Sequence, residues 1–185
     1  MRRIALLGIA LALGGLGTLP ARGSDETSRQ VVATYLFTVT DDFIVDVYRN
    51  GEKVPDSQRT LLVETFGATT ERIDLKVRKG DWIVFNVVNN RMRWGGCSYF
   101  AVTGRGAAGV AFTTELASGL WSCCDDTEKV SEFIHDRDYL AGNRAQPIPN
   151  PWGDGDRLMN EVADGWSGQP LWGRTRNTWI KYIAR

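Results

Sequence analysis

The sequence is poor in the residues that bind transition metals. It contains one histidine, His135, and three cysteines, Cys97, Cys123 and Cys124. A blue-copper site needs two histidines together with a cysteine, so a single histidine excludes that class of protein. The three cysteines and the histidine also lack the paired spacing of a zinc finger, so we expect no structural zinc.

Long hydrophobic runs are also scarce. The longest, Ile4 to Leu16, has about 13 residues, whereas a helix needs roughly 20 to cross a bilayer. It follows two arginines and precedes the small residues of Ala21-Arg22-Gly23. This order predicts a secretory signal peptide over residues 1–23 and a mature protein that begins near Ser24 and is secreted or periplasmic. An N-terminal anchor and a buried core helix are the alternatives, and we expect no membrane span elsewhere.

Charge of either sign is not in large excess. The chain has 22 Lys and Arg residues and 22 Asp and Glu residues. Without the three arginines of residues 1–23, 19 basic residues face 22 acidic ones, a net charge of −3. A mildly acidic surface does not favour nucleic acid or an anionic membrane as partner. Residues 24–185 show no repeat or long linker, and their length suits one domain.

Short segments rich in strand-forming residues are abundant. Residues 34–48 are expected to form a hairpin, followed by a tight Asn50-Gly51 turn. Arg72 to Val77 alternates polar and apolar residues, which predicts a half-buried strand. Trp82 to Val88 is apolar nearly throughout, which predicts a strand covered on both faces.

The rest of the chain continues this pattern. Further strands are expected at residues 98–103, 109–114, 130–134 and 177–184, a long loop at 141–156 and a short helix at 157–163. Strands at this spacing predict an all-β fold, a single antiparallel β-sandwich with a core over about residues 34–185.

Three segments resemble the galactose-binding-domain-like jelly rolls of exported proteins. Phe37 to Gly51 is similar to that family's opening, a strand, an Asp-Asp turn, a strand and Asn-Gly. Leu75 to Asn90 resembles its Gly-Asp followed by a long central strand, and Thr178 to Ile183 resembles its closing strand. The resemblance implies a jelly-roll sandwich, a fold that hosts sugar binding, protein adhesion and structural roles.

A glycine motif needs separate attention. Gly104 to Gly109 matches the pattern G-x-G-x-x-G, which in a dinucleotide-binding fold is followed by a helix. The residues that follow, Val110 to Thr114, favour a strand instead. We therefore interpret the motif as a glycine turn between two strands.

The cysteines suggest a disulfide, since export permits one. Adjacent cysteines rarely pair with each other, so the expected bond joins Cys97 to Cys123 or Cys124. One thiol is then left over.

The candidate ligand site lies on a loop after the central strand, because loops at the ends of a sandwich collect binding residues. A flat indole stacks on the apolar face of a sugar ring, and arginine and aspartate hydrogen-bond its hydroxyls. The expected site has Trp94 and Trp121 as platforms, with Arg91, Arg93, Tyr99, Asp125 and Asp126 around them. In the alternative, the tryptophans are core side chains and Asp125-Asp126 is only a turn.

Metal binding and catalysis have less support. Asp154 and Asp156 are oxygen ligands for a possible calcium ion, but the segment lacks the spacing of an EF-hand, and a solvated turn is the alternative. No other cofactor is expected. His135 and Asp136 are neighbours that point apart on a strand, so they do not form a base and its orienting acid.

Taken together, these patterns predict an exported, non-catalytic module that binds a glycan or another cell-surface ligand. A structural or protein-interaction sandwich is the first alternative, and a secreted hydrolase is the second.

Overall fold

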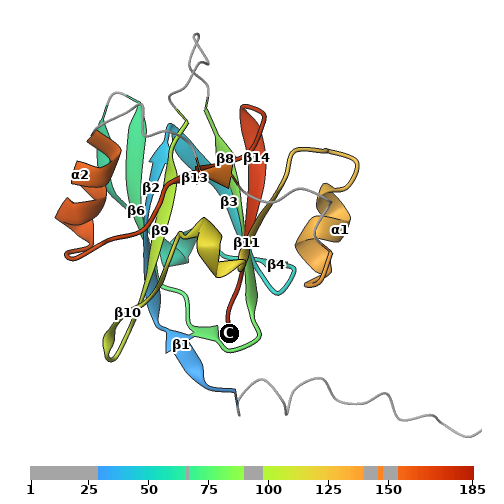
Figure 1. Cartoon of the computed structure of the whole chain (residues 1–185), viewed down its shortest axis with the longest axis horizontal. Helices are drawn as coiled ribbons and strands as arrows, with labels where there is room; N and C mark the ends of the chain where they lie inside the picture. The colour runs from blue at the N-terminus through green and yellow to red at the C-terminus, as the bar shows by residue number, and fades with distance from the viewer. Residues whose placement is uncertain (1–28, 66, 90–97, 140–145, 148–153) are drawn as a thin grey trace, which may run out of the picture.

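A computed structural model describes residues 29–65, 67–89, 98–139, 146–147 and 154–185. Two five-stranded antiparallel sheets pack face to face (Figure 1). The first, here the β2 sheet, has the order β10 (Gly109–Thr113), β9 (Phe100–Gly106), β2 (Tyr35–Asp41), β6 (Ala68–Ile73), β5 (Arg59–Thr65). The second, the β8 sheet, has the order β11 (Trp121–Cys124), β14 (Asn177–Ile183), β8 (Trp82–Val88), β3 (Phe43–Arg49), β4 (Glu52–Lys53). The predicted all-β antiparallel sandwich is confirmed.

Short elements flank the two sheets. β1 (Val31–Ala33) pairs with β7 (Val77–Arg78), and β12 (Gln146–Pro147) pairs with β13 (Leu171–Trp172). The helix α2 (Asp154–Val162) packs on the β2 sheet, and α1 (Val130–His135) packs on the β8 sheet (Figure 1). Two 3₁₀ turns, η1 (Asp56–Gln58) and η2 (Leu116–Ser118), connect strands. Among the described helices, neither combines the length and the apolar character needed to cross a membrane.

The main core lies between the sheets and follows from the alternation of side chains along the strands. Phe85 and Phe100 face each other from opposite sheets, with their ring centroids 5.1 Å apart. β8 is covered on both faces, as predicted: Phe85 belongs to the central core, whereas Val84 packs in the cluster under α1. Burial of such side chains is the main force that holds the two sheets together.

The predicted hairpin at residues 34–48 is wrong, although both of its strands exist. β2 and β3 belong to different sheets, because the chain turns at Asp42, whose φ is +62°. β2 pairs with β6 and β9, and β3 pairs with β8, so each strand takes partners that are distant in the sequence. The Asn50-Gly51 turn is confirmed, with φ of +55° and +85° between the paired residues Arg49 and Glu52.

Two further predictions need correction. Residues 72–77 do not form one strand, since β6 ends at Ile73 and β7 begins at Val77, yet the predicted alternation of buried and exposed side chains persists through them. Residues 130–134 form helix α1 and not a strand, because the helix buries Phe133 and Ile134 on the β8 sheet. A short apolar run does not distinguish the two structures by itself.

Three other predictions agree with the structure. The glycine motif is the turn of the β9–β10 hairpin, where Gly106 pairs with Gly109. The predicted helix at 157–163 corresponds to α2, and the last predicted strand corresponds to β14.

Candidate functional site

The predicted platform Trp121 is a core side chain. It is 2% exposed, and its indole Nε1 donates a hydrogen bond to the carbonyl of Thr113 at 3.2 Å. Its ring centroid lies 4.8 Å from that of Tyr182. A buried indole offers no face to a sugar, so the alternative reading of Trp121 as a core side chain is correct. The other predicted platform, Trp94, and the arginines Arg91 and Arg93 lie outside the described residues.

The strand register also places Trp121 beside the start of β8. Trp121 pairs with Tyr182, which pairs with Ile83 near the start of β8. β8 ends at Val88, and Asn89 follows it at the opposite end of the strand. Ile83 and Val88 are five residues apart in β8, which corresponds to about 17 Å along the strand.

Tyr99 is buried and joins the β2 sheet to α2. Its hydroxyl donates to Oδ1 of Asp156 at 2.7 Å. Burial, with the nearby Asp156 carboxylate, raises the pKa of Tyr99 well above its usual range. Asp156, one of the two candidate calcium ligands, therefore accepts a hydrogen bond from a tyrosine, and the side chain of Asp154 lies outside the described parts. Within the described ranges, no three or more His, Cys, Asp or Glu side chains are grouped to hold a metal ion.

Asp125 and Asp126 stabilise turns. Asp125 accepts hydrogen bonds from the backbone N–H of Arg174 at 2.8 Å and from the hydroxyl of Thr175 at 3.2 Å. Asp126 pairs with Lys129 at 3.1 Å, and this interaction lowers the pKa of the Asp126 carboxyl. Their carboxylates thus hold neighbouring backbone, which is the turn role given above as the alternative.

The two described cysteines are free thiols on opposite faces of β11. Cys123 points into the central core, and Cys124 lies under α1. Burial raises the pKa of Cys123 to about 12 and also raises that of Cys124. Neither thiol forms a disulfide within the described residues, contrary to the prediction that one of them bonds to Cys97. Cys97 itself lies outside those residues.

His135 is not part of a catalytic arrangement with its sequence neighbour. It lies exposed at the end of α1, and its Nδ1 is 2.8 Å from the carbonyl oxygen of Ser131 in the same helix. That contact belongs to the helix and orients no nucleophile.

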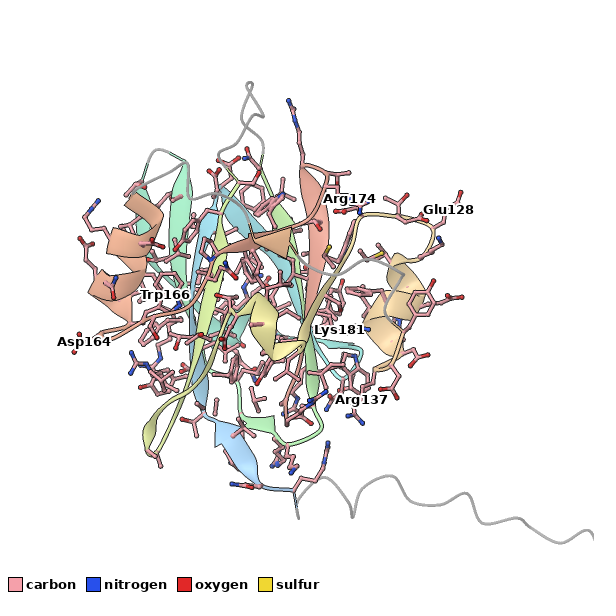
Figure 2. The ribbon with its side chains drawn as sticks, in the orientation of Figure 1. Glu128, Arg137, Asp164, Trp166, Arg174 and Lys181 are labelled. Carbon is pink, nitrogen blue, oxygen red and sulfur yellow. The ribbon has the colours of Figure 1, made fainter. Side chains whose placement is uncertain are left out.

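Lys181 is a fully buried lysine of β14. It projects from β14 toward α1 (Figure 2) and is 0% exposed. Its Nζ donates to the carbonyl oxygens of Asp136 at 2.8 Å and Tyr139 at 2.7 Å, and it lies 4.2 Å from the centroid of the Phe133 ring. Burial lowers the pKa of the Lys181 ammonium to about 8, despite the opposing effect of Asp136 and Asp138. Lys181 therefore fastens the chain that follows α1 to the sheet.

The lowered pKa of Lys181 predicts a pH dependence of stability. Between about pH 8 and 10.5 the folded chain has released this proton, whereas the unfolded chain still holds it. The free energy of unfolding must then rise with pH in that window, by at most about 1.4 kcal/mol per pH unit. Urea unfolding of the natural chain and of Lys181→Met at each pH measures this rise. Subtracting the two free energies of unfolding cancels the contributions of the buried tyrosines and cysteines, which both chains share. A difference that stays flat or falls with pH contradicts this assignment.

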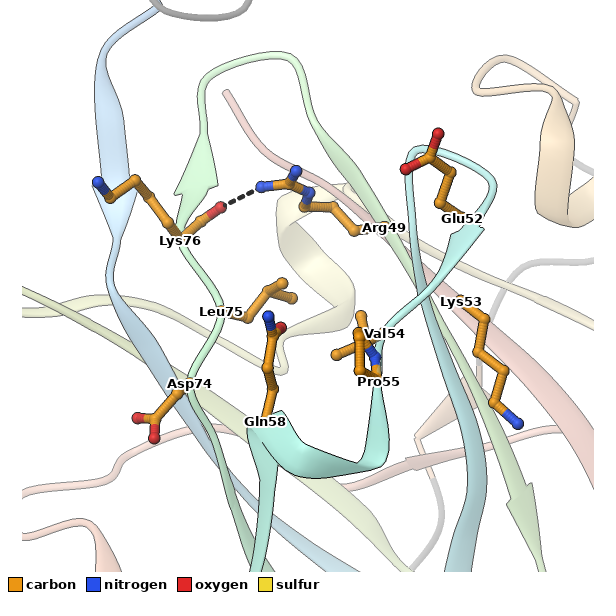
Figure 3. Close-up of a pocket in the computed structure, with 9 residues that line it drawn as sticks. All are labelled: Arg49, Glu52, Lys53, Val54, Pro55, Gln58, Asp74, Leu75 and Lys76. Carbon is orange, nitrogen blue, oxygen red and sulfur yellow. Dashed lines mark hydrogen bonds between the residues drawn. The ribbon is translucent and has the colours of Figure 1, made fainter.

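A groove of about 300 Å³ lies where the chain crosses between the two sheets (Figure 3). The Asn50-Gly51 turn starts β4, which ends after two residues, and η1 then leads into β5 of the other sheet. A second crossing, residues 74–76, runs beside it, joined to the first by the hydrogen bond from the N–H of Asp74 to the carbonyl of Gln58 at 2.8 Å. The groove is the space that these two crossings leave between them.

The groove combines an apolar floor with polar side chains. Val54 and Leu75 form the floor and are almost fully buried. Arg49 closes one side by donating from Nη1 to the carbonyl oxygen of Lys76 at 2.9 Å. Gln58 rises between Leu75 and Val54, with the guanidinium of Arg49 above it (Figure 3).

The remaining charges of the groove divide into paired and unpaired groups. Lys53 pairs with Asp46 and Asp74 pairs with Arg72, and in Figure 3 their charged ends point away from the centre. In the described part of the chain, the side chains of Glu52, Gln58 and Lys76 form no hydrogen bond or ion pair. Of these three, the Gln58 amide lies toward the centre of the groove, where it can both donate and accept a hydrogen bond, whereas the charged ends of Glu52 and Lys76 point away (Figure 3).

Two other hollows have less to offer a polar ligand. They have volumes of about 250 and 330 Å³ and lie beside β10, where they share Val32, Ala111 and Arg185. The larger one is lined mainly by small or apolar residues of β1 and the β9–β10 turn. Polar groups orient a ligand in its site, and more polar residues line the groove beside β4.

Sequence reasoning missed this groove. The alternation at residues 72–77 correctly placed Asp74 and Lys76 on an exposed face, and the Asn50-Gly51 turn predicted that the chain reverses before Glu52. Nothing in the sequence indicated that these two segments lie side by side. Comparisons with known proteins found no protein-family model, no curated protein and no solved structure that matches the chain.

Proposed function

We propose that this protein is an exported, non-catalytic binding module that takes a glycan unit in the groove between β4 and residues 74–76. The observation that carries the proposal is the exposed, unpaired amide of Gln58 at the centre of the groove (Figure 3). A sugar ring has an apolar face of C–H groups and a rim of hydroxyls that donate and accept hydrogen bonds. The Gln58 amide suits the hydroxyls, whereas Val54 and Leu75, 3% and 4% exposed, close the groove beneath it.

Size and charge support the same ligand class. A volume of about 300 Å³ is at the small end of ligand pockets, which suits one sugar unit better than a long oligomer. The lining carries both signs of charge, so neither a strongly anionic nor a strongly cationic ligand is favoured. The likeness of three segments to galactose-binding-domain-like proteins and the signal-peptide pattern of residues 1–23 agree with an exported glycan binder.

Among the residues that the structure describes, no aromatic ring lines the groove, and we therefore expect weak binding by a single site. Without a stacking platform, an affinity on the order of 1 mM, about −4 kcal/mol, is reasonable for one sugar. A function at such an affinity requires more than one site acting together.

A glycan array followed by calorimetry on the best ligand tests the proposal. Gln58→Ala removes an exposed amide that lines the groove, and we expect it to weaken binding about fivefold to tenfold, the effect of one hydrogen bond. Ser57→Ala, its neighbour in η1, does not line the groove and serves as the matched control, with unchanged affinity. Absence of binding to every glycan, or equal affinities of the two variants, contradicts the proposal.

A further inference from the structure

β5 is an edge strand with unusual apolar exposure. It ends the β2 sheet, and its outer side pairs with no strand in the described ranges. Leu61 is 54% exposed and Leu62 is 40% exposed. Exposed edge strands are templates for pairing with another chain, and soluble proteins usually protect them with charges or prolines. The centre of β5, Leu61 to Val63, has neither.

The neighbouring strand of the other sheet is exposed at the same edge of the sandwich. β4 covers β3 only at Tyr48 and Arg49, so the first half of β3 has no strand on its outer side in the described chain. Arg59 of β5 donates to the carbonyl oxygens of Ile44 at 2.6 Å and Val45 at 3.0 Å, which places the two edges side by side.

Exposed apolar side chains gather at this edge. Phe43 and Val45 of β3 are exposed, as are Leu61 and Leu62 of β5. These four make up most of the large apolar side chains that are exposed in the described residues. Exposed apolar side chains on neighbouring edge strands favour an interaction with another protein.

The sequence of β5 matches itself when it is paired in the antiparallel direction. Leu61, Leu62 and Val63 occupy the centre of the strand, and polar residues occupy both ends. With a two-fold axis at Leu62, the apolar centre of one copy faces that of the other, and Thr60 faces Glu64. Antiparallel pairing keeps the two Glu64 residues at opposite ends of the interface, whereas parallel pairing in register would place them side by side.

The register within the sheet places a β-bulge in the middle of β5. Leu61 pairs with Glu71 and Val63 pairs with Thr70, so Leu62 is the extra residue of a bulge and has no partner in β6. The residue at the centre of the apolar segment is therefore the one that β6 engages least.

We infer that two copies of this chain associate along β5, with antiparallel pairing about a two-fold axis at Leu62. The two β2 sheets then form one continuous sheet, and each copy keeps its own groove. Gln58 lies four residues before Leu62, so the two Gln58 residues are about 27 Å apart along the strand direction. If the proposed function holds, the dimer carries two weak glycan sites, and avidity for a ligand that spans both compensates for the low affinity of each.

Sedimentation velocity of the full chain over a wide concentration range tests the interface without any glycan. We expect a concentration-dependent dimer, and Leu62→Lys should raise its dissociation constant at least about 100-fold, because it places two charges at the axis. Val110→Lys is the matched control, since Val110 is 45% exposed on β10, the opposite edge of the same sheet. A natural chain that stays monomeric at several hundred micromolar, or a dimer that both variants weaken equally, overturns the inference.

Cysteine cross-linking tests the register. Residues directly opposite in an antiparallel pair have Cβ atoms about 4.5–5.5 Å apart, so Leu62→Cys should form a disulfide-linked dimer on mild oxidation. Thr60→Cys, whose counterpart lies about 14 Å away along the strand, should cross-link no more than the natural chain. Equal cross-linking of the two variants contradicts the axis at Leu62.

Discussion

Trp121→Ala is expected to lower the free energy of unfolding by about 3–5 kcal/mol, the usual cost of replacing a large buried aromatic residue by alanine. The indole is 2% exposed, packs against Tyr182 and donates to the Thr113 carbonyl. Its removal leaves a cavity and an unpaired carbonyl oxygen. Urea unfolding followed by circular dichroism measures the loss.

The control for Trp121→Ala is Phe43→Ala, because Phe43 is an exposed aromatic residue of β3. Its removal should cost less than about 1 kcal/mol. If Trp121→Ala instead left stability unchanged and abolished glycan binding, Trp121 would be a ligand platform and its placement in the core would be wrong.

Glu71→Gln is expected to cost about 3 kcal/mol, because it removes one charge from an almost buried ion pair. Glu71 and Arg59 are 9% and 12% exposed, and both oxygens of Glu71 accept hydrogen bonds from Arg59 at 2.9 Å. The same guanidinium donates to two carbonyls of β3. Without the Glu71 carboxylate, a cation is left poorly solvated at the edge where the sheets meet. Urea unfolding measures the change.

Asp74→Asn provides the matched comparison for Glu71→Gln. Asp74 pairs with Arg72 at the same distance, 2.9 Å, but the two side chains are largely exposed to solvent. Exposed pairs contribute at most about 1 kcal/mol, so Asp74→Asn should change stability little. Equal effects of the two substitutions would show that burial of the Arg59–Glu71 pair has no energetic consequence.

Local patterns predicted the strands well and their partners poorly. The apolar run at residues 82–88 and the Asn50-Gly51 turn depend only on nearby residues, and both agree with the structure. The assignment of β2 and β3 to different sheets depends on long-range pairing with β6 and β8, which no local pattern contains. Residues 130–134 form a helix because a sheet face is present to bury Phe133.

The candidate site was less predictable than the fold for a similar reason. The predicted site relied on Trp121, and residue type alone did not show on which face of β11, or at which end of the sandwich, the indole would lie. The groove depends on two crossings that are about twenty residues apart in the chain and that meet through one backbone hydrogen bond. Its exposed side chains, Glu52, Gln58 and Lys76 among them, are ordinary surface residues when each is considered alone.

The most direct test of the proposed function is a map of backbone amide shifts in a ¹H–¹⁵N spectrum during titration with the best glycan. The proposal predicts shifts concentrated at residues 49–58 and 74–76, with little change at Asp41, Asn89 and Ser98 at the other end of the sandwich. Shifts confined to that other end, from which the segment containing Trp94 begins, would contradict the groove as the binding site.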